Sequence, residues 1–533
     1  MYNSSPIPEI HNHSSNQLRR FFLTRLPLRM VFEAGKAPLV PTTQLLKLNC
    51  RTEAHLATKL NGFDHRSYED AISALNGLQT NSVTLKESIG RAHNTQCNHV
   101  KETQVFLEKI GITLDDLDKL SVIHVAGTKG KGSTCALVES ILRNQNVKTG
   151  FYSSPHLLNV TERIRINGEP ISKTKFSQYF WKIYGTLEET KQSVHDMPPY
   201  FKFLTIMAYY VFLKEKVDVA VVEVGIGGEY DCTNVVRNTK TVGITSLGLE
   251  HTQLLGQTYK DIAWQKSGII KSGSSVFSTH QNDECIPVLL ERAHEKNANL
   301  RFIPDFMEYK YHDANVFNDI ATNPTKLRNA SLAIQLSYDW IRKNPHKLTN
   351  KSICEHVDSS DNLTLPVEVM EALVNCYWPG RCQTLIYRNL TLYIDGAHTI
   401  DSLQLCVDWF NDKTNSRPEK KLLLFNVTGD RNVSDMLDII NSKIQFEQAL
   451  FTPNISSLQT QDKDNLYTFA QPNHSKRNAE YWSSLKPQNK SKDFSCLADV
   501  FKYLQKHFGH EETSILVTGS LHLVGEVLRT IKE

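Results

Sequence analysis

A run of glycine, lysine and serine after a short apolar segment carries the most recognisable chemistry of this chain. The run consists of Gly127, Thr128, Lys129, Gly130, Lys131, Gly132 and Ser133. Glycines allow a tight turn that points backbone N–H groups at a polyphosphate, and a following helix adds positive partial charge. Lys131 can reach the outer phosphates, and Ser133 offers a magnesium ligand. The run therefore predicts a site for a nucleoside triphosphate. It departs from the strict P-loop pattern because Gly132 precedes Ser133, so a plain glycine turn remains an alternative.

Two further residues that can bind a metal or a proton, Glu223 and His251, lie in or after other apolar segments. Glu223 lies inside the apolar segment 217–224, where an unpaired carboxylate is costly to bury. His251 follows the segment 241–246, at the sheet edge where open α/β folds bind ligands. Each residue also has an interpretation without a ligand. Glu223 could form an ion pair with an arginine, and His251 could be a hydrogen-bonded histidine at the surface. Together with the glycine run they predict a magnesium–triphosphate site.

A lysine occupies the last turn of a further predicted helix. Thr258 and Asp261 resemble a capping box that begins this helix, and Gly268 ends it. From the residues alone, Lys266 is expected to complement the negative end of the helix dipole.

A parallel β-sheet would bring these residues together, because the carboxyl ends of its strands lie at one edge. From residue 120 onward, short β-branched runs alternate with segments of helical period, which is typical of a parallel sheet covered on both faces. The predicted strands are 122–125, 149–153, 217–224, 241–246 and 275–278. Four later runs predict a second compact sheet: 391–394, 421–425, 449–452 and 514–517. Asn167–Gly168 predicts a tight hairpin, and the polar, lysine-rich segment 471–493 predicts a solvated loop.

Composition excludes several classes of protein. The 60 Lys and Arg against 57 Asp and Glu do not indicate a nucleic-acid partner. The ten cysteines are scattered without metal-binding spacing, which favours a reducing compartment. The most apolar stretch, 205–213, is too short to span a bilayer.

The first residues have the composition of a mitochondrial transit peptide. No acidic residue occurs between Glu9 and Glu33, while arginines punctuate apolar residues from position 19 to 29. A disordered basic tail is the alternative. Initiation at Met30 would remove the signal, so we expect a mitochondrial form, in the matrix or on the inner-membrane side, and a cytoplasmic form.

Seven ordered motifs resemble those of folylpolyglutamate synthases, which are ATP-dependent amide ligases related to the Mur ligases. The motifs are AGTKGKGS at 126–133, SSPH at 153–156, EVGIGGEYDCTNV at 223–235, SLGLEHTQLLGQ at 246–257, AWQKSGI at 263–269, WPGR at 378–381 and YIDGAH at 393–398. The segment PPYFKFLT at 198–205 resembles the eukaryotic members. The resemblance implies an α/β fold with a P-loop ATPase domain, a smaller C-terminal α/β domain and an active site in the cleft between them. We expect a leader over 1–45 and domains over 46–376 and 377–533.

The resemblance also implies roles for single residues. Residues 127–133 hold the phosphates, with Lys131 catalytic, and Ser154, Glu223 and His251 bind magnesium. Lys266 matches a lysine that relatives carry as a carbamate supporting a second metal, which replaces the dipole interpretation. Arg381, Asp395 and His398 reach ATP from the second domain, while Asn329 contacts the nucleotide or lies on an ordinary helix surface. The implied catalytic set is Lys131, His251, Lys266 and Arg381. The implied cofactors are ATP, Mg²⁺, the carbamate and a monovalent cation.

The implied activity is ligation of L-glutamate to the γ-carboxylate of tetrahydrofolate and its polyglutamates. An acyl phosphate is the intermediate, ADP and phosphate are released, and a monomer is expected. Dihydrofolate synthase is the nearest alternative, because the same motifs serve it. A GTP-binding switch protein would need an Asn-Lys-x-Asp motif to recognise guanine. The most similar segment, 489–492, ends in lysine where that motif has aspartate. A non-catalytic scaffold is a third interpretation. Phe201 and Phe203 are equally consistent with stacking on a folate ring and with ordinary core packing.

Overall fold

The computed structural model describes residues 66–79, 99–193, 196–311, 323–358, 363–415, 419–428, 432–456, 464 and 472–532. The predicted leader and Met30 lie outside these residues.

An eight-stranded sheet contains all five strands predicted in the first half of the chain. Its order is β4-β3-β2-β5-β1-β6-β7-β8, and the pairs from β2 through β8 are parallel. The strands are β1 (Val122–Ala126), β2 (Thr149–Tyr152), β3 (Ile164–Ile166), β4 (Glu169–Pro170), β5 (Val219–Glu223), β6 (Thr241–Ile244), β7 (Ser275–Ser278) and β8 (Asn299–Phe302). The hairpin prediction is confirmed, because Asn167 and Gly168 join β3 to β4 with φ of 52° and 82°.

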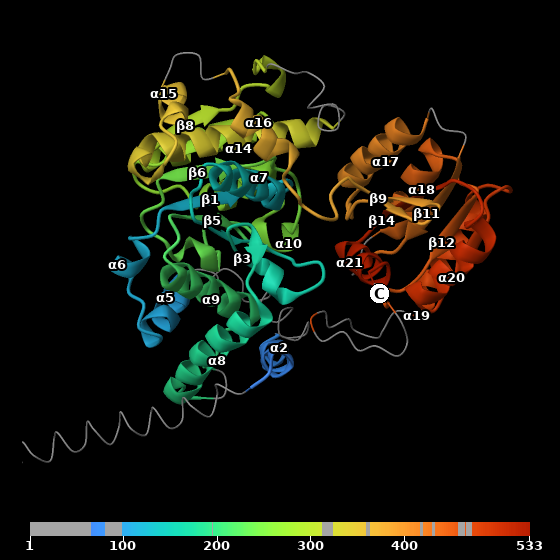
Figure 1. Cartoon of the computed structure of the whole chain (residues 1–533), viewed down its shortest axis with the longest axis horizontal. Helices are drawn as coiled ribbons and strands as arrows, with labels where there is room; N and C mark the ends of the chain where they lie inside the picture. Colours follow the sequence, from blue (N-terminus) through green and yellow to red (C-terminus); the bar gives the residue numbers. More distant parts are fainter. Residues whose placement is uncertain are drawn as a thin grey trace, which may run out of the picture. The chain divides into compact units, whose positions relative to one another are not determined.

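Helices cover both faces of this sheet (Figure 1). On β5, Val219 and Val221 face a core built with α7 (Lys131–Asn144), α14 (Pro324–Lys343) and α16 (Val367–Val374). The alternate residues Ala220 and Val222 face a core built with α8 (Lys173–Thr190) and α9 (Tyr200–Glu215). The remaining helices of this half are α2 (Tyr68–Gly77), α5 (His99–Lys109), α6 (Leu114–Leu117), α10 (Thr252–Leu255), α11 (Tyr259–Ser267), α12 (Cys285–Glu295) and α15 (Ser352–Asp358). The strands β1, β2, β5 and β6 are buried throughout, as the continuous apolar runs of β1, β5 and β6 predict.

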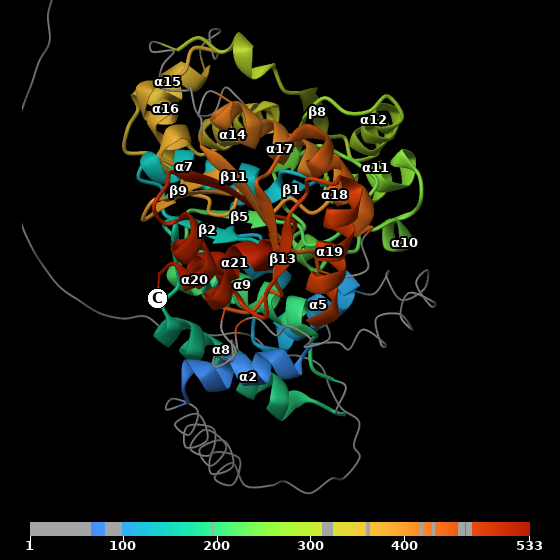
Figure 2. The same cartoon turned by 90° about the vertical axis from the view of Figure 1, so that its right-hand side faces the viewer.

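A six-stranded sheet follows in the second half. Its order is β13-β12-β11-β14-β10-β9, with only β9 antiparallel to its neighbour. The strands are β9 (Gln383–Tyr387), β10 (Leu390–Ile394), β11 (Lys420–Phe425), β12 (Gln448–Phe451), β13 (Ser491–Asp493) and β14 (Thr513–Thr518). The helices are α17 (Ile400–Thr414), α18 (Val433–Lys443), α19 (Pro472–Leu485), α20 (Leu497–Phe508) and α21 (Leu521–Thr530), which Figure 2 shows around the sheet. The four predicted strands are therefore confirmed.

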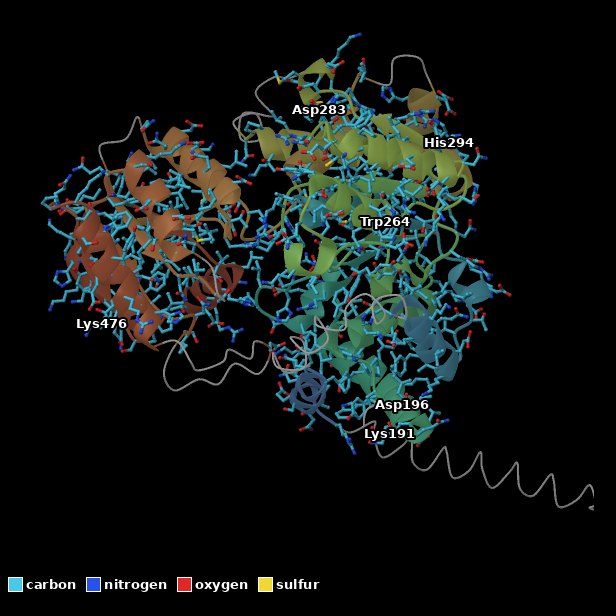
Figure 3. All side chains as sticks on the ribbon, turned by 180° about the vertical axis from the view of Figure 1, so that it is seen from behind. Lys191, Asp196, Trp264, Asp283, His294 and Lys476 are labelled. Atoms are coloured by element: carbon cyan, nitrogen blue, oxygen red, sulfur yellow. The ribbon has the colours of Figure 1, made fainter. Side chains whose placement is uncertain are left out.

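The prediction of a solvated loop over 471–493 is wrong. This segment forms α19 and the edge strand β13. Ser475, Ala479 and Trp482 recur at helical spacing and are buried, while the intervening positions are polar; Lys476 lies on the exposed side (Figure 3). This narrow stripe is enough to hold α19 in place, because it packs against α18 and β12.

The aromatic residues of α9 belong to the core. Phe203 is fully buried within the cluster that covers one sheet face, and the partly buried Phe201 packs against the same cluster. The ordinary-core interpretation is therefore confirmed for Phe203. None of the described helices is long and apolar enough to cross a membrane.

Candidate functional site

The glycine run forms a tight loop between β1 and α7. Gly127 has φ 151°, and a Cβ at this position would lie 1.7 Å from Thr245 Oγ1, so no larger residue fits. The backbone N–H groups of Thr128 and Lys129 donate to Ser246 O at 2.9 and 3.2 Å, which ties the loop to the segment after β6. The helix α7 begins at Lys131, so its free N–H groups and Lys131 face the same space.

Gly130 is the N-cap of α7 and lies against Asn329. Its φ is 91°, and a Cβ here would lie 2.3 Å from Asn329 Oδ1. Asn329 is only 5% exposed, so the helix-surface interpretation of this residue is wrong. Its role as a nucleotide contact remains a prediction.

We expect Gly130→Ala to lower the free energy of unfolding by about 1–2 kcal/mol, because a Cβ disfavours the left-handed conformation. It should also weaken binding of an ATP analogue, since Asn329 must shift. Urea denaturation and calorimetric titration measure the two effects. Gly77→Ala is the control, because a Cβ there meets nothing within 4 Å. Unchanged stability and affinity in Gly130→Ala would contradict the assigned loop geometry.

Glu223 lies beside the first turn of α7. Parallel pairing places it opposite Val125 at the ends of β5 and β1, directly next to the glycine loop. A Cβ on Gly132 would lie 3.1 Å from Glu223 Oε2, and the backbone N–H of Ser154 donates to the same oxygen at 3.1 Å. Burial raises the pKa of Glu223, while the positive charges of Lys131 and Arg381 oppose the rise. A buried carboxylate beside a phosphate loop is a suitable oxygen ligand for a hard cation.

Lys266 points at the glycine loop. It is 4% exposed, and its Nζ donates to Gly127 O at 2.8 Å, so it does not serve the carboxyl end of its own helix. Burial, and then the nearby Lys131, lower the pKa of Lys266 to about 7. The capping box that begins this helix is present at Thr258 and Asp261, as predicted.

His251 and Glu250 follow β6 and lie among these lysines. His251 is the N-cap of α10 with φ 53°. Desolvation and the charges of Lys266 and Lys131 lower its pKa, and Glu250 opposes them. His251 as a whole residue is exposed, although its imidazole is partly desolvated.

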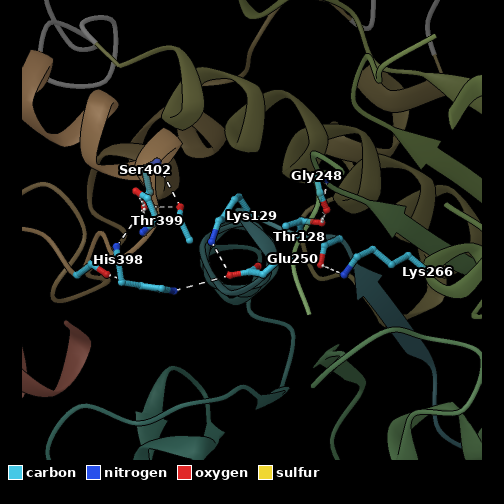
Figure 4. A network of polar contacts seen from close by, with 10 residues as sticks. Thr128, Lys129, Gly248, Glu250, Lys266, His398, Thr399 and Ser402 are labelled. Atoms are coloured by element: carbon cyan, nitrogen blue, oxygen red, sulfur yellow. Dashed lines mark hydrogen bonds and ion pairs between the residues drawn. The ribbon is translucent and has the colours of Figure 1, made fainter. Parts of the chain in front are cut away.

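His398, from the second half of the chain, lies close to an ion pair between Lys129 of the loop and Glu250. Lys129 Nζ lies 2.8 Å from Glu250 Oε1, and His398 Nε2 lies 3.9 Å from the same oxygen (Figure 4). Burial raises the pKa of Glu250, but the positive charges of Lys129 and His251 outweigh it and leave that pKa lowered. Lys129 is thus already paired with a carboxylate, and Glu250 was not assigned a role from the sequence although it lies within a quoted motif.

Of the site residues predicted in the second half, Arg381 lies near Glu223, whereas Asp395 contacts Cys382. Arg381 is close enough to Glu223 to oppose the rise of its pKa, and its Nη1 donates to Gly380 O at 3.2 Å. Asp395 is directed elsewhere: it accepts from the backbone N–H of Cys382 at 2.8 Å and from the Cys382 thiol at 3.3 Å. Asp395 therefore fixes the backbone directly after Arg381.

The metal prediction rests on a mixed set of ligands. Across the described ranges, no three His, Cys, Asp or Glu side chains gather closely enough to hold a metal ion. The predicted set of Ser154, Glu223 and His251 includes a hydroxyl, and phosphate oxygens of a nucleotide would add to it. Within this set, the backbone N–H of Ser154 contacts Glu223. That the three residues bind magnesium remains a prediction.

Comparison with known proteins identifies relatives along most of the chain. A family model described as "Dihydrofolate synthetase, C-terminal domain" matches residues 381–530. The chain is 38% identical over 541 residues to the human protein named "Folylpolyglutamate synthase, mitochondrial", covering 87% of this chain and 92% of that protein. Its fold is similar to the structure described as "apo form of L. casei FPGS", with TM-score 0.65, 20% identity, and coverage of 88% and 100%. It is also similar to one described as "FPGS-AMPPCP-folate complex", with TM-score 0.64, 20% identity and the same coverage.

Proposed function

Because the chain belongs to the folylpolyglutamate synthase family, we propose that it ligates L-glutamate to the γ-carboxylate of tetrahydrofolate and its polyglutamates, with cleavage of ATP to ADP and phosphate. The observation that carries this proposal is the grouping of Lys131, Glu223 and Lys266 around the glycine loop. An ATP-binding loop, a carboxylate and a lysine near neutrality together suit transfer of a phosphoryl group between two anions.

The reaction needs activation of a carboxylate. Its carbonyl carbon is a poor electrophile, so the folate γ-carboxylate oxygen attacks the γ-phosphorus of ATP, ADP leaves, and an acyl phosphate forms. The α-amine of glutamate then attacks the acyl carbon, and inorganic phosphate leaves as the amide forms. Lys131 and Arg381 would stabilise the charge that develops on the transferring phosphoryl group. Water must be kept out while the acyl phosphate exists.

Magnesium fits this site as a bound ion. Glu223, Ser154 and His251 would hold it, and it would neutralise phosphate charge when bound. Glu223 is suited to this role because its carboxylate borders the first turn of α7 at Gly132.

Lys266 is suited to form a carbamate. Its neutral amine attacks the carbon of CO₂, a nitrogen–carbon bond forms, and one amine proton is released. Only the neutral amine can react, and a pKa of about 7 keeps a large share of Lys266 neutral at physiological pH. The product is an oxygen ligand in place of a cation.

Dihydrofolate synthase is kept as a second function because the model that matches residues 381–530 bears that description. The deciding experiment offers the purified chain dihydropteroate and tetrahydrofolate in parallel, each with ATP and glutamate, and measures ADP release and product mass. We expect turnover with tetrahydrofolate that requires glutamate. Turnover with dihydropteroate alone would favour the second function, and ADP release independent of glutamate would refute both.

We also propose two locations and a monomeric state. The human relative is named as mitochondrial, and the arginine-rich leader with Met30 behind it supports a mitochondrial and a cytoplasmic form. A C-terminally tagged chain found only in the cytosol would count against the mitochondrial form. Light scattering of the purified chain measures the oligomeric state.

A further inference from the structure

A cavity of about 420 Å³ adjoins the candidate site on the side of Trp378. It is lined by α7, the β3–β4 hairpin, the segment 375–379 and the end of the chain after α21. Trp378 reaches from this cavity to the glycine loop, since a Cβ on Gly132 would lie 3.2 Å from its ring. Leu157, Glu162 and Arg165 line both this cavity and a smaller one that contains Arg381. The cavity therefore borders the reaction centre and does not contain it.

Two of the acidic residues in its wall are already engaged. Glu162 accepts hydrogen bonds from the backbone N–H groups of residues 157, 158 and 159 at 2.9–3.0 Å. Glu139 accepts from Arg143 Nε at 3.0 Å and from Thr149 Oγ1 at 2.6 Å. The remaining acid, Glu169, is exposed to solvent. None of the three forms an ion pair with Arg165, in the part of the chain that the structure describes.

Arg165 is held by two aromatic rings and one backbone carbonyl. Its guanidinium lies 5.8 Å from the Phe151 ring centre and 5.2 Å from that of Trp378. Its Nε donates to the carbonyl oxygen of Glu162 at 3.2 Å. No hydrogen bond from its two terminal nitrogens is present among the described residues, so both remain available. A planar guanidinium held between rings presents two parallel donors, which match a carboxylate.

Further positive charge surrounds this group. Arg143 and Lys532 also line the cavity, and Lys532 lies at the exposed end of the chain. Arg143 is paired with Glu139, whereas no ion pair of Arg165 or Lys532 is present among the described residues. These two cations suit a ligand that carries carboxylate groups.

We propose that this cavity binds the carboxylates of a glutamate unit, with Arg165 as the principal contact. The proposal rests on the ligase function above and adds a substrate site to it. Two sources share the required chemistry: free L-glutamate, and a residue of the γ-glutamyl tail of the folate. The position next to the reaction centre suits both, because each must lie within reach of the acyl phosphate.

The test is steady-state kinetics of Arg165→Gln in the full chain. One arm measures KM for glutamate with a monoglutamyl acceptor, and the other measures KM for tetrahydrofolates carrying one and three glutamates. We expect at least a ten-fold rise in one of these constants, with KM for ATP within two-fold of wild type. A rise for glutamate identifies the free amino acid, and a rise confined to the triglutamyl acceptor identifies the tail.

Two further variants keep the result decisive. Arg301→Gln removes an exposed arginine on the edge strand β8 and should change no constant. Lys532→Gln should raise the same constant as Arg165→Gln by about three-fold, and it decides the question if Arg165→Gln does not fold. Constants within two-fold of wild type in the folded variants would overturn the proposal. Absence of glutamate-dependent turnover in the wild-type chain would instead overturn the ligase function itself.

Discussion

Replacement of Lys131 by alanine is expected to lower the rate of glutamate-dependent ATP turnover by roughly 10²–10³-fold or more, as removal of a single charge-stabilising donor does in other enzymes. Lys131 is the first residue of α7, and its side chain is partly exposed, so the core does not depend on it. The measurement is kcat at saturating ATP, with the thermal midpoint as a test of folding. The midpoint should stay within a few degrees of wild type.

The electrostatic effect of Lys131 on its neighbours adds a second observable. Lys131 lowers the pKa of both Glu223 and Lys266, so its loss should raise both pKa values. Lys260→Ala is the matched control, because Lys260 is exposed on the nearby helix α11. A Lys131→Ala variant that keeps more than a tenth of wild-type kcat would remove Lys131 from the phosphate site.

Replacement of Lys266 by alanine should reduce activity strongly and make it responsive to added short-chain carboxylic acids. The truncated side chain leaves space beside Gly127, where Lys266 Nζ now lies 2.8 Å from the carbonyl oxygen. A small carboxylate bound there would replace the oxygen ligand that the proposed carbamate would supply. The measurement is initial rate against acetate or formate concentration at constant ionic strength.

The same lysine predicts a pH dependence of activation by CO₂. The pKa of Lys266 is lowered from its ordinary value to about 7, so the neutral amine predominates above that pH and the ammonium below it. The rate at which added bicarbonate restores activity to enzyme prepared without CO₂ should therefore rise as the pH increases through about 7. The rise follows titration of the amine, provided the concentration of dissolved CO₂ is held constant.

Lys271 provides the control for both experiments. Burial lowers the pKa of Lys271 to about 8, yet its Nζ donates to Asn234 O and not to the glycine loop. Lys271→Ala should gain nothing from added acids. Full activity of the wild-type chain in CO₂-free buffer, or equal rescue of both variants, would exclude the carbamate.

Sequence reasoning succeeded where the information is local. Apolar runs bounded by glycine predicted the central strands β1, β5 and β6 because a strand buried on both faces must be apolar throughout. It missed β8, β9 and β13. Alternate residues of β8 and β9 are exposed, and β13 is a short polar strand that pairs with β12 and contacts α19. The sequences of β9 and β13 have no distinctive alternation of apolar and polar residues.

For the site, the sequence by itself determined the glycine loop, the buried carboxylate of Glu223 and the helix that carries Lys266. Each follows from a pattern of a few neighbouring residues, since turn geometry and capping act over short distances along the chain. Glu223 was placed beside the loop only by the strand order, which makes β5 the neighbour of β1 although β2, β3 and β4 lie between them in sequence.

Only the tertiary structure decided the contacts between distant segments. Asn329 lies against Gly130, Glu250 pairs with Lys129 and faces His398, and Asp395 is directed at Cys382. Each joins residues whose spacing in sequence follows no helical or strand period, so no local pattern encodes them. They form because packing of the two sheets and their helices brings charged and polar groups together, and burial then requires each group to find a partner.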